Sequence, residues 1–141
     1  MKIMALDVGR KRIGVAISDE LEITAQPHGT VNRAIYKDDL AKLIEIATKN
    51  NVKIVVLGMP FRTDNSKPGE MAGEIKRFAK DIKESGFETE FLDERFTTTI
   101  AENALISQGM RREKRKTVID TVAAQVILQD FLEIRRSKRT Y

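Results

Sequence analysis

The sequence predicts an α/β fold, a five-stranded mixed sheet in the strand order 3-2-1-4-5 flanked by helices. Two uninterrupted apolar runs, Ile3 to Leu6 and Val52 to Leu57, are typical of strands buried on both faces of a sheet. Between and after the later strands, apolar residues recur at helical spacing, which predicts the connecting helices. Right-handed crossovers then place the fourth strand beside the first and the fifth beyond it.

The first part of the chain predicts a three-stranded meander. The expected strands are Lys2 to Val8, Arg12 to Ser18 and roughly Glu22 to Val31, joined by short turns. In the second strand, the branched residues Ile13, Val15 and Ile17 alternate with small or polar residues. This alternation is typical of an antiparallel strand with one half-buried face.

The rest of the chain alternates between helices and strands. A helix is expected from Asp38 to Asn50. It is followed by a buried strand, Val52 to Leu57, which ends at Gly58-Met59-Pro60, and by a polar segment from Phe61 to Gly69. The second helix places Met71, Ile75, Phe78 and Ile82 on one stripe and stops at Ser85-Gly86. A fifth strand from Phe87 to Leu92 alternates with glutamates, which predicts a position near a sheet edge. Two last helices are expected at Thr99 to Gln108 and Thr117 to Arg136.

Length and composition limit the protein class. With 141 residues and 41% hydrophobic content, residues 1–141 are expected to form one domain. No apolar run approaches the ~18 residues that a membrane helix needs, and no signal-peptide pattern opens the chain, so a cytoplasmic location without membrane contact is expected. Since the chain has no cysteine and one histidine, a metal site would need oxygen ligands.

Asp7 is the first candidate for chemistry. It ends an apolar run and is followed by Val8-Gly9 and three cations, an arrangement that suits a metal beside a phosphate. The alternative is an ordinary Asp-x-Gly tight turn.

The predicted strand order brings further acids to the same edge of the sheet. Strands one and five would lie ~10 Å apart, two strand spacings, so Asp7 and Glu94 would share one edge. Asp120 near the start of the last helix is the third candidate for a two-metal site. Its alternative is a capping box running from Thr117 to Asp120, which would stabilise a helix start whatever the function.

The net charge of +4 is concentrated late in the chain. The segment Arg111 to Lys116 carries five cations and one anion, and Arg135 to Arg139 carries four cations, so the remainder is net acidic. Clustered lysine and arginine residues favour binding of polyanions such as nucleic acid. The alternative is a solvated loop and a frayed tail.

Three motifs together resemble the YqgF (RuvX) family. Asp-x-Gly-x-Lys-Arg-Ile-Gly begins at Asp7, Asp-Glu-Arg-x-Thr-Thr begins at Asp93, and Val-Ile-Asp-x-x-Ala-Ala-x-x-Ile-Leu-Gln contains Asp120. The family comprises nucleases similar in fold to the RuvC Holliday junction resolvase, with an RNase H-like domain, and is linked to 5′-end processing of pre-16S ribosomal RNA. RuvC resolvases carry a glutamate at the end of the fourth strand, where this chain has Gly58-Met59-Pro60.

The resemblance implies a metal-dependent nuclease that hydrolyses phosphodiester bonds during ribosome biogenesis. Asp7, Glu94 and Asp120 would be the catalytic residues and would hold Mg²⁺ or Mn²⁺, with Asp93 as the alternative to Glu94. The partner would be precursor ribosomal RNA. The residues expected to bind it are Arg10, Lys11, Arg12, Arg95, Arg111, Arg112, Lys114, Arg115 and Lys116.

Three other functions stay open. They are a non-catalytic RNA-binding or ribosome-assembly factor, a Holliday junction resolvase that acts on DNA, and a phosphotransferase, against which the short length argues. His28 lies in a turn-rich segment and receives no catalytic role. The oligomeric state cannot be read from the sequence.

Overall fold

The computed structural model describes residues 1–59, 71–93 and 112–139, with only the backbone described for residues 112–121 and 139. The segment Phe61 to Gly69 and the helix expected at Thr99 to Gln108 lie outside the described residues. The described elements, in chain order, are β1 (Lys2–Val8), β2 (Arg12–Ser18), β3 (Ala25–Asn32), α1 (Tyr36–Lys49), β4 (Val52–Met59), α2 (Ala72–Glu84), β5 (Glu88–Asp93) and α4 (Arg112–Arg139).

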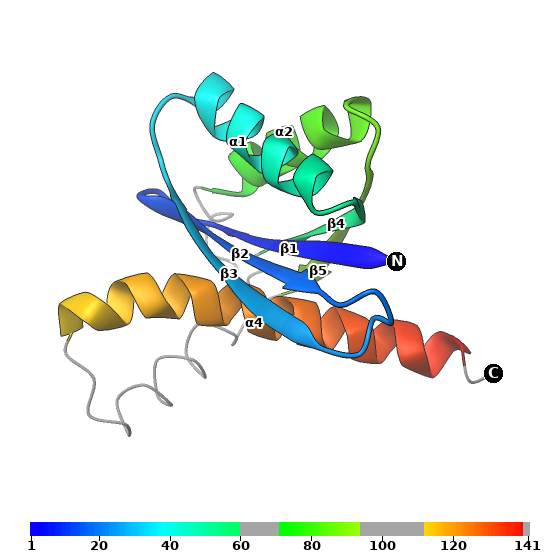
Figure 1. Ribbon diagram of the computed structural model, residues 1–141. Helices are drawn as coiled ribbons and strands as arrows, with labels where there is room; N and C mark the ends of the chain where they lie inside the picture. Colours follow the sequence, from blue (N-terminus) through cyan, green and yellow to red (C-terminus); the bar gives the residue numbers. More distant parts are fainter. Residues whose placement is uncertain (60–70, 94–111, 140–141) are drawn as a thin grey trace, which may run out of the picture.

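The sheet has the predicted architecture. Five strands lie in the order β3-β2-β1-β4-β5, so the predicted order 3-2-1-4-5 and the edge position of the fifth strand are confirmed. The meander β1-β2-β3 is antiparallel, whereas β4 and β5 join β1 in parallel. Figure 1 shows α1 and α2 on one face of the sheet and α4 along the other. The carboxyl ends of β1, β4 and β5 therefore meet at one edge.

Successive side chains of β1 pack alternately into two separate hydrophobic clusters, one on each face of the sheet. Met4 and Leu6 are fully buried in the cluster that contains Phe78 of α2. Ile3 and Ala5 are fully buried in the cluster that contains Ile127 of α4. Helices on both faces explain why the strand is continuously apolar, as its sequence predicted.

The expectation of a half-buried second strand is wrong. Gly14, Ala16 and Ser18 are buried along with the branched residues of β2. Ala16 packs in the same cluster as Ala124 of α4. The small side chains of this face mark a helix contact, because they leave room for α4 to approach the sheet closely.

Strand β3 begins later than expected. It starts at Ala25 rather than Glu22, because Glu22 takes a left-handed backbone conformation with φ 58°. The preceding turn is held by Asp19, whose Oδ1 accepts hydrogen bonds from the backbone N–H groups of Ile23 at 2.7 Å and Thr24 at 2.9 Å. Helix α1 starts at Tyr36, two residues before the expected Asp38.

Helix α4 is longer than expected at both ends. It begins at Arg112 rather than Thr117 and continues to Arg139 rather than Arg136. Thr117 therefore lies inside the helix, so the interpretation of Thr117 and Asp120 as a capping box is wrong. The residues from Arg112 to Lys116, which were expected in a loop, are helical. Arginine, lysine and glutamate are good helix formers, so the helix begins before the capping signal at Thr117.

The second basic segment is not a frayed tail. The guanidinium of Arg135 donates from Nε to Glu22 Oε1 at 2.9 Å, and Arg136 Nη2 donates to the Ile23 carbonyl at 3.3 Å. These contacts fasten the end of α4 to the turn between β2 and β3. Within the described residues, no helix is long and apolar enough to cross a membrane.

Helices α1 and α2 are joined through Tyr36. Its hydroxyl donates to Asp81 Oδ2 at 2.6 Å, and the guanidinium carbon of Arg77 lies 3.7 Å from the centre of its ring. Burial, followed by the hydrogen bond and charge of Asp81, raises the pKa of Tyr36 above its ordinary value of 10.0.

This link predicts that folding stability falls in strong alkali. Because the pKa of Tyr36 is raised in the folded state, its contribution is complete below pH 10.0 and is lost as the pH rises above it. In a Tyr141→Phe background, ultraviolet titration should show Tyr36 ionising well above pH 10.0. Adding Asp81→Asn should lower that midpoint. A Tyr36 midpoint at the ordinary value in the folded protein would contradict the prediction.

Candidate active site at the carboxyl ends of the parallel strands

Asp7 lies on β1, close to its carboxyl end. It is the register partner of Gly14 on β2, and the pairing of Leu6 with Leu57 places it level with Gly58 on β4. Since Ile3 and Ala5 pack on the α4 side and neighbouring strand residues alternate, Asp7 belongs to the α4 face. Its side chain is partly exposed, so a carboxylate is accessible at this edge.

Strand β5 adds its last residues to the same edge. Leu92 is the register partner of Gly58 and Asp93 of Met59, so Asp7, Gly58 and Leu92 form a row across β1, β4 and β5. The row spans ~10 Å, two strand spacings. Leu92 packs against the α4-side cluster, which puts Asp93 on the opposite face from Asp7. Glu94 and Arg95 lie outside the described residues.

A tight turn presents cations beside Asp7. The Gly9 N–H donates to the Arg12 carbonyl at 3.0 Å, and a Cβ at Gly9 would lie 2.8 Å from that oxygen, so only glycine fits. Asp7 lies in β1 and pairs with Gly14 of β2, so it precedes the turn and is not part of it. Arg10 and Lys11 are exposed and Arg12 is partly exposed, which places positive charge close to the carboxylate.

Arg33, which the sequence analysis missed, anchors this turn. Its backbone N–H donates to the Lys11 carbonyl, and its Nη1 donates to the Gly9 carbonyl, both at 2.9 Å. Its Nε donates to Asp39 Oδ2 at 2.8 Å, and its Nη2 bonds Glu74. One guanidinium thus ties the turn to α1 and α2.

One carboxylate partner of Arg33 is completely buried, whereas the other, Glu74, is partly exposed. Asp39 is fully buried, and its second carboxylate oxygen accepts the Ala34 N–H at 2.9 Å. Burial lowers the pKa of Arg33, but the hydrogen bonds and charges of Glu74 and Asp39 outweigh it and the pKa is raised. An isolated arginine after a strand and an aspartate in the first turn of a helix give no sequence signal for such a pair, because both are common on surfaces.

The third candidate acid lies on the helix that covers this face. Asp120 is in α4, one helical turn before Ala124, which is fully buried against the sheet. The cations Arg112, Lys114, Arg115 and Lys116 precede it on the same helix. Arg111 lies outside the described residues, and side chains are described only from Val122 onward in this part of α4.

The candidate donors are carboxylates, which are the ligands that a hard divalent cation prefers. Among the residues the structure describes, no group of three or more histidine, cysteine, aspartate or glutamate side chains gathers to hold a metal. Of the three predicted acids, Asp7 is the one whose side chain is described, and the other two belong to parts whose side chains are not described. Carboxylates without nearby histidine or cysteine suit Mg²⁺ or Mn²⁺ and not a zinc site.

Structural likeness was found to solved Holliday junction resolvases. RuvC from T. thermophilus, in a complex with a Holliday junction substrate, superposes with a TM-score of 0.62 at 14% identity, covering 96% of both chains. The fowlpox virus resolvase, in complex with junction DNA, gives a TM-score of 0.60 at 15% identity, covering 94% of this chain and 97% of that one. At these identities the likeness establishes the fold, which is the RNase H-like fold expected from the motifs.

Sequence comparison identifies much closer relatives. A protein of Endomicrobium trichonymphae, named "Putative pre-16S rRNA nuclease", is 44% identical over 136 residues, covering 95% of this chain and 96% of its own length. A protein of Myxococcus xanthus with the same name is 43% identical over 141 residues, covering 99% and 93%. The family model described as "RuvX: Holliday junction resolvase" matches residues 1–134. The chain therefore belongs to the RuvX family.

Proposed function

We propose that this protein is a divalent-metal-dependent nuclease that hydrolyses phosphodiester bonds in precursor 16S ribosomal RNA. The observation that carries the proposal is the position of Asp7, on the α4 face where the parallel strands end, beside a rigid cationic turn. The names of relatives more than 40% identical over nearly the whole chain support the ribosomal substrate. That substrate agrees with the cytoplasmic location expected from the sequence.

We assign Glu94, and not Asp93, as the ligand from β5. Leu92 packs on the α4 face with the same cluster as Ile3 and Ala5. Side chains alternate along a strand, so a continued β5 would return to the face of Asp7 at position 94. The longer glutamate side chain also helps to span the two strand spacings between β5 and β1.

The length of α4 supports Asp120 as the third ligand. Arg135 contacts the turn between β2 and β3, at the end of the sheet opposite to the carboxyl end of β1. Asp120 lies 15 residues earlier, about 22 Å along the helix axis, which is comparable to the length of a seven-residue strand. The helix therefore runs back toward the edge that carries Asp7, and position 120 falls on the stripe of Ala124 and Leu128.

Asp7, Glu94 and Asp120 would hold Mg²⁺ or Mn²⁺. Such ions, when bound in pairs, activate a water molecule and stabilise the leaving oxygen in phosphodiester hydrolysis. Arg10, Lys11 and Arg12 neutralise the phosphates next to the bond to be cut. Because Arg33 anchors the backbone of this turn, these cations start from a preorganised position.

Holliday junction cleavage is the second candidate, favoured by the description of the family and by the fold shared with RuvC. Against it, β4 ends at Leu57-Gly58-Met59 and brings no carboxylate to the candidate site. Cleavage of precursor ribosomal RNA and of a four-way DNA junction, measured side by side with Mg²⁺ and Mn²⁺, distinguishes the two.

Asp7→Asn should reduce cleavage of precursor RNA to background while RNA affinity is retained, because a neutral amide is a poorer ligand for a hard cation. The measurement is a gel-based cleavage assay with Mg²⁺ or Mn²⁺, paired with fluorescence anisotropy for binding. Glu20→Gln, an exposed acid at the far end of the sheet, is the matched control and should remain active. Undiminished cleavage by Asp7→Asn would defeat the nuclease assignment at this site.

Glu94→Gln and Asp93→Asn should separate the two adjacent acids. We expect Glu94→Gln to lose cleavage and Asp93→Asn to keep most of it, because Asp93 lies on the opposite face from Asp7. Titrating Mn²⁺ in each variant tests whether metal dependence changes with the acid. The reverse result, with Asp93 essential and Glu94 dispensable, would exclude our choice of ligand.

Neutralising cations in the first basic segment, Arg111 to Lys116, should weaken RNA binding and reduce the dependence of binding on salt concentration. The variant replaces Arg112, Lys114, Arg115 and Lys116 with glutamine. For single-stranded RNA, the slope of log affinity against log salt should fall by up to about 0.7 for each phosphate that the variant no longer neutralises. The control replaces four exposed lysines of α1 and α2, namely Lys37, Lys76, Lys80 and Lys83. Equal weakening in both variants would show that the segment has no special role.

A further inference from the structure

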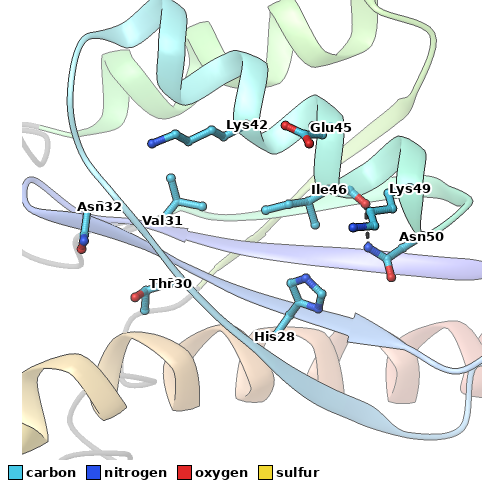
Figure 2. Close-up of a pocket in the computed structure, with 9 residues that line it drawn as sticks. All are labelled: His28, Thr30, Val31, Asn32, Lys42, Glu45, Ile46, Lys49 and Asn50. Carbon is cyan, nitrogen blue, oxygen red and sulfur yellow. Dashed lines mark hydrogen bonds between the residues drawn. The ribbon is translucent and has the colours of Figure 1, made fainter.

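A groove with a volume of about 500 Å³ lies between the edge strand β3 and helix α1. Figure 2 shows Val31 of β3 and Ile46 of α1 pointing toward one another inside it, with His28 reaching up from β3. This volume lies within the range of ligand-binding sites. The predicted nuclease site does not use this groove, because α1 and α4 lie on opposite faces of the sheet (Figure 1).

The lining combines an apolar floor with positive charge. Val31 is buried and Ile46 is partly buried, whereas Lys42 and Lys49 are exposed on the α1 side. The two lysines are seven residues apart, about 10 Å along the helix axis. Glu45 between them is the one acid among the described residues that line the groove, so the lysines leave net positive charge. Such a lining suits a flat, partly apolar group that carries negative charge.

His28 adds a flat ring to this lining. The register of β3 shifts between the partners of Val15 and Ala16, so His28 occupies a bulge without a partner in β2. Its side chain is exposed in the groove and is the single histidine of the chain. Imidazole rings stack on unpaired nucleobases, as other aromatic side chains do.

The groove begins next to the cationic turn of the candidate site. Asn32 lines the groove and is the register partner of Arg12, the last cation of that turn. Thr30, also in the lining, is level with Asp7 through Gly14, two strand spacings or ~10 Å away. A strand whose phosphate lies on the turn can therefore continue around the edge of the sheet into the groove.

The β3 edge itself argues against a peptide as the occupant. An added peptide strand needs a regular row of backbone hydrogen-bonding groups, but β3 contains Pro27, which has no N–H, and the bulge at His28. The lysines also favour a polyanion.

We propose that this groove binds a short single-stranded segment of the RNA substrate, flanking the cleaved bond. Bases lie on Val31, Ile46 and the ring of His28, and the backbone phosphates contact Lys42 and Lys49. The inference rests on the proposed nuclease function for the identity of the strand, but its binding test needs no cleavage.

The test uses His28 as a site-specific reporter. Because the chain has one histidine, its imidazole C–H resonances identify this groove in proton NMR spectra. We expect these resonances to shift and saturate when wild-type protein, with EDTA to prevent cleavage, is titrated with a short oligouridylate. Inorganic phosphate at the same phosphate concentration should cause little shift. Unmoved His28 resonances while anisotropy reports RNA binding, or an equal shift with phosphate alone, would overturn the proposal.

Paired lysine variants supply the second arm. Lys42→Gln with Lys49→Gln should weaken oligouridylate binding several-fold and lower the salt slope by about 0.7 for each phosphate that is no longer neutralised. The control, Lys76→Gln with Lys83→Gln, removes two exposed lysines at the same seven-residue spacing on α2 and should bind normally. Equal weakening in both pairs would overturn the proposal. A wild-type protein that binds through the groove but never cleaves would overturn the nuclease function and leave the groove assignment standing.

Discussion

The structure around the candidate site depends on the buried ion pair between Arg33 and Asp39. Asp39 is fully buried, and it is tolerated because its carboxylate accepts hydrogen bonds from Arg33 and from the Ala34 N–H. Removing one member of such a pair typically costs about 3–5 kcal/mol, because the other charge stays buried without compensation. The same guanidinium holds the Gly9 carbonyl and Glu74, so one side chain joins the β1–β2 turn to both helices on its face of the sheet.

The residues that stabilise the turn lie on one face of the sheet, and the candidate catalytic carboxylate lies on the other. On the α1 and α2 side, Arg33 and the apolar cluster around Phe78 fix the turn and the helices. On the α4 side, the residues of β1 become small and then acidic, from Ala5 to Asp7, which leaves a carboxylate at the edge where parallel strands end. A rigid support on one face and an accessible acid on the other is the arrangement that catalysis by positioned charges requires.

Helix α4 links the two ends of the sheet. Its final turns are fastened to the β2–β3 turn through Arg135, and Gln125 donates to the Ala25 carbonyl at 3.0 Å. These contacts fix the course of the helix, so the position of Asp120 follows from where the other end is anchored.

The sequence by itself determined the strand order, the two-sided burial of β1 and β4, the edge position of β5 and the place of Asp7, because apolar periodicity and crossover handedness are properties of the chain. Only the tertiary structure decided the burial of both β2 faces, the anchoring of the last turns of α4 and the Arg33–Asp39 pair. Each of these features depends on a contact between segments that are distant in the sequence. Ala16 of β2 packs with residues of α4, Arg135 of α4 bonds the β2–β3 turn, and Arg33 bonds Gly9 and Glu74. Local sequence patterns indicate secondary-structure propensity and periodicity. They do not indicate which residue will contact a buried charge or a small side chain, because that depends on how distant segments pack together.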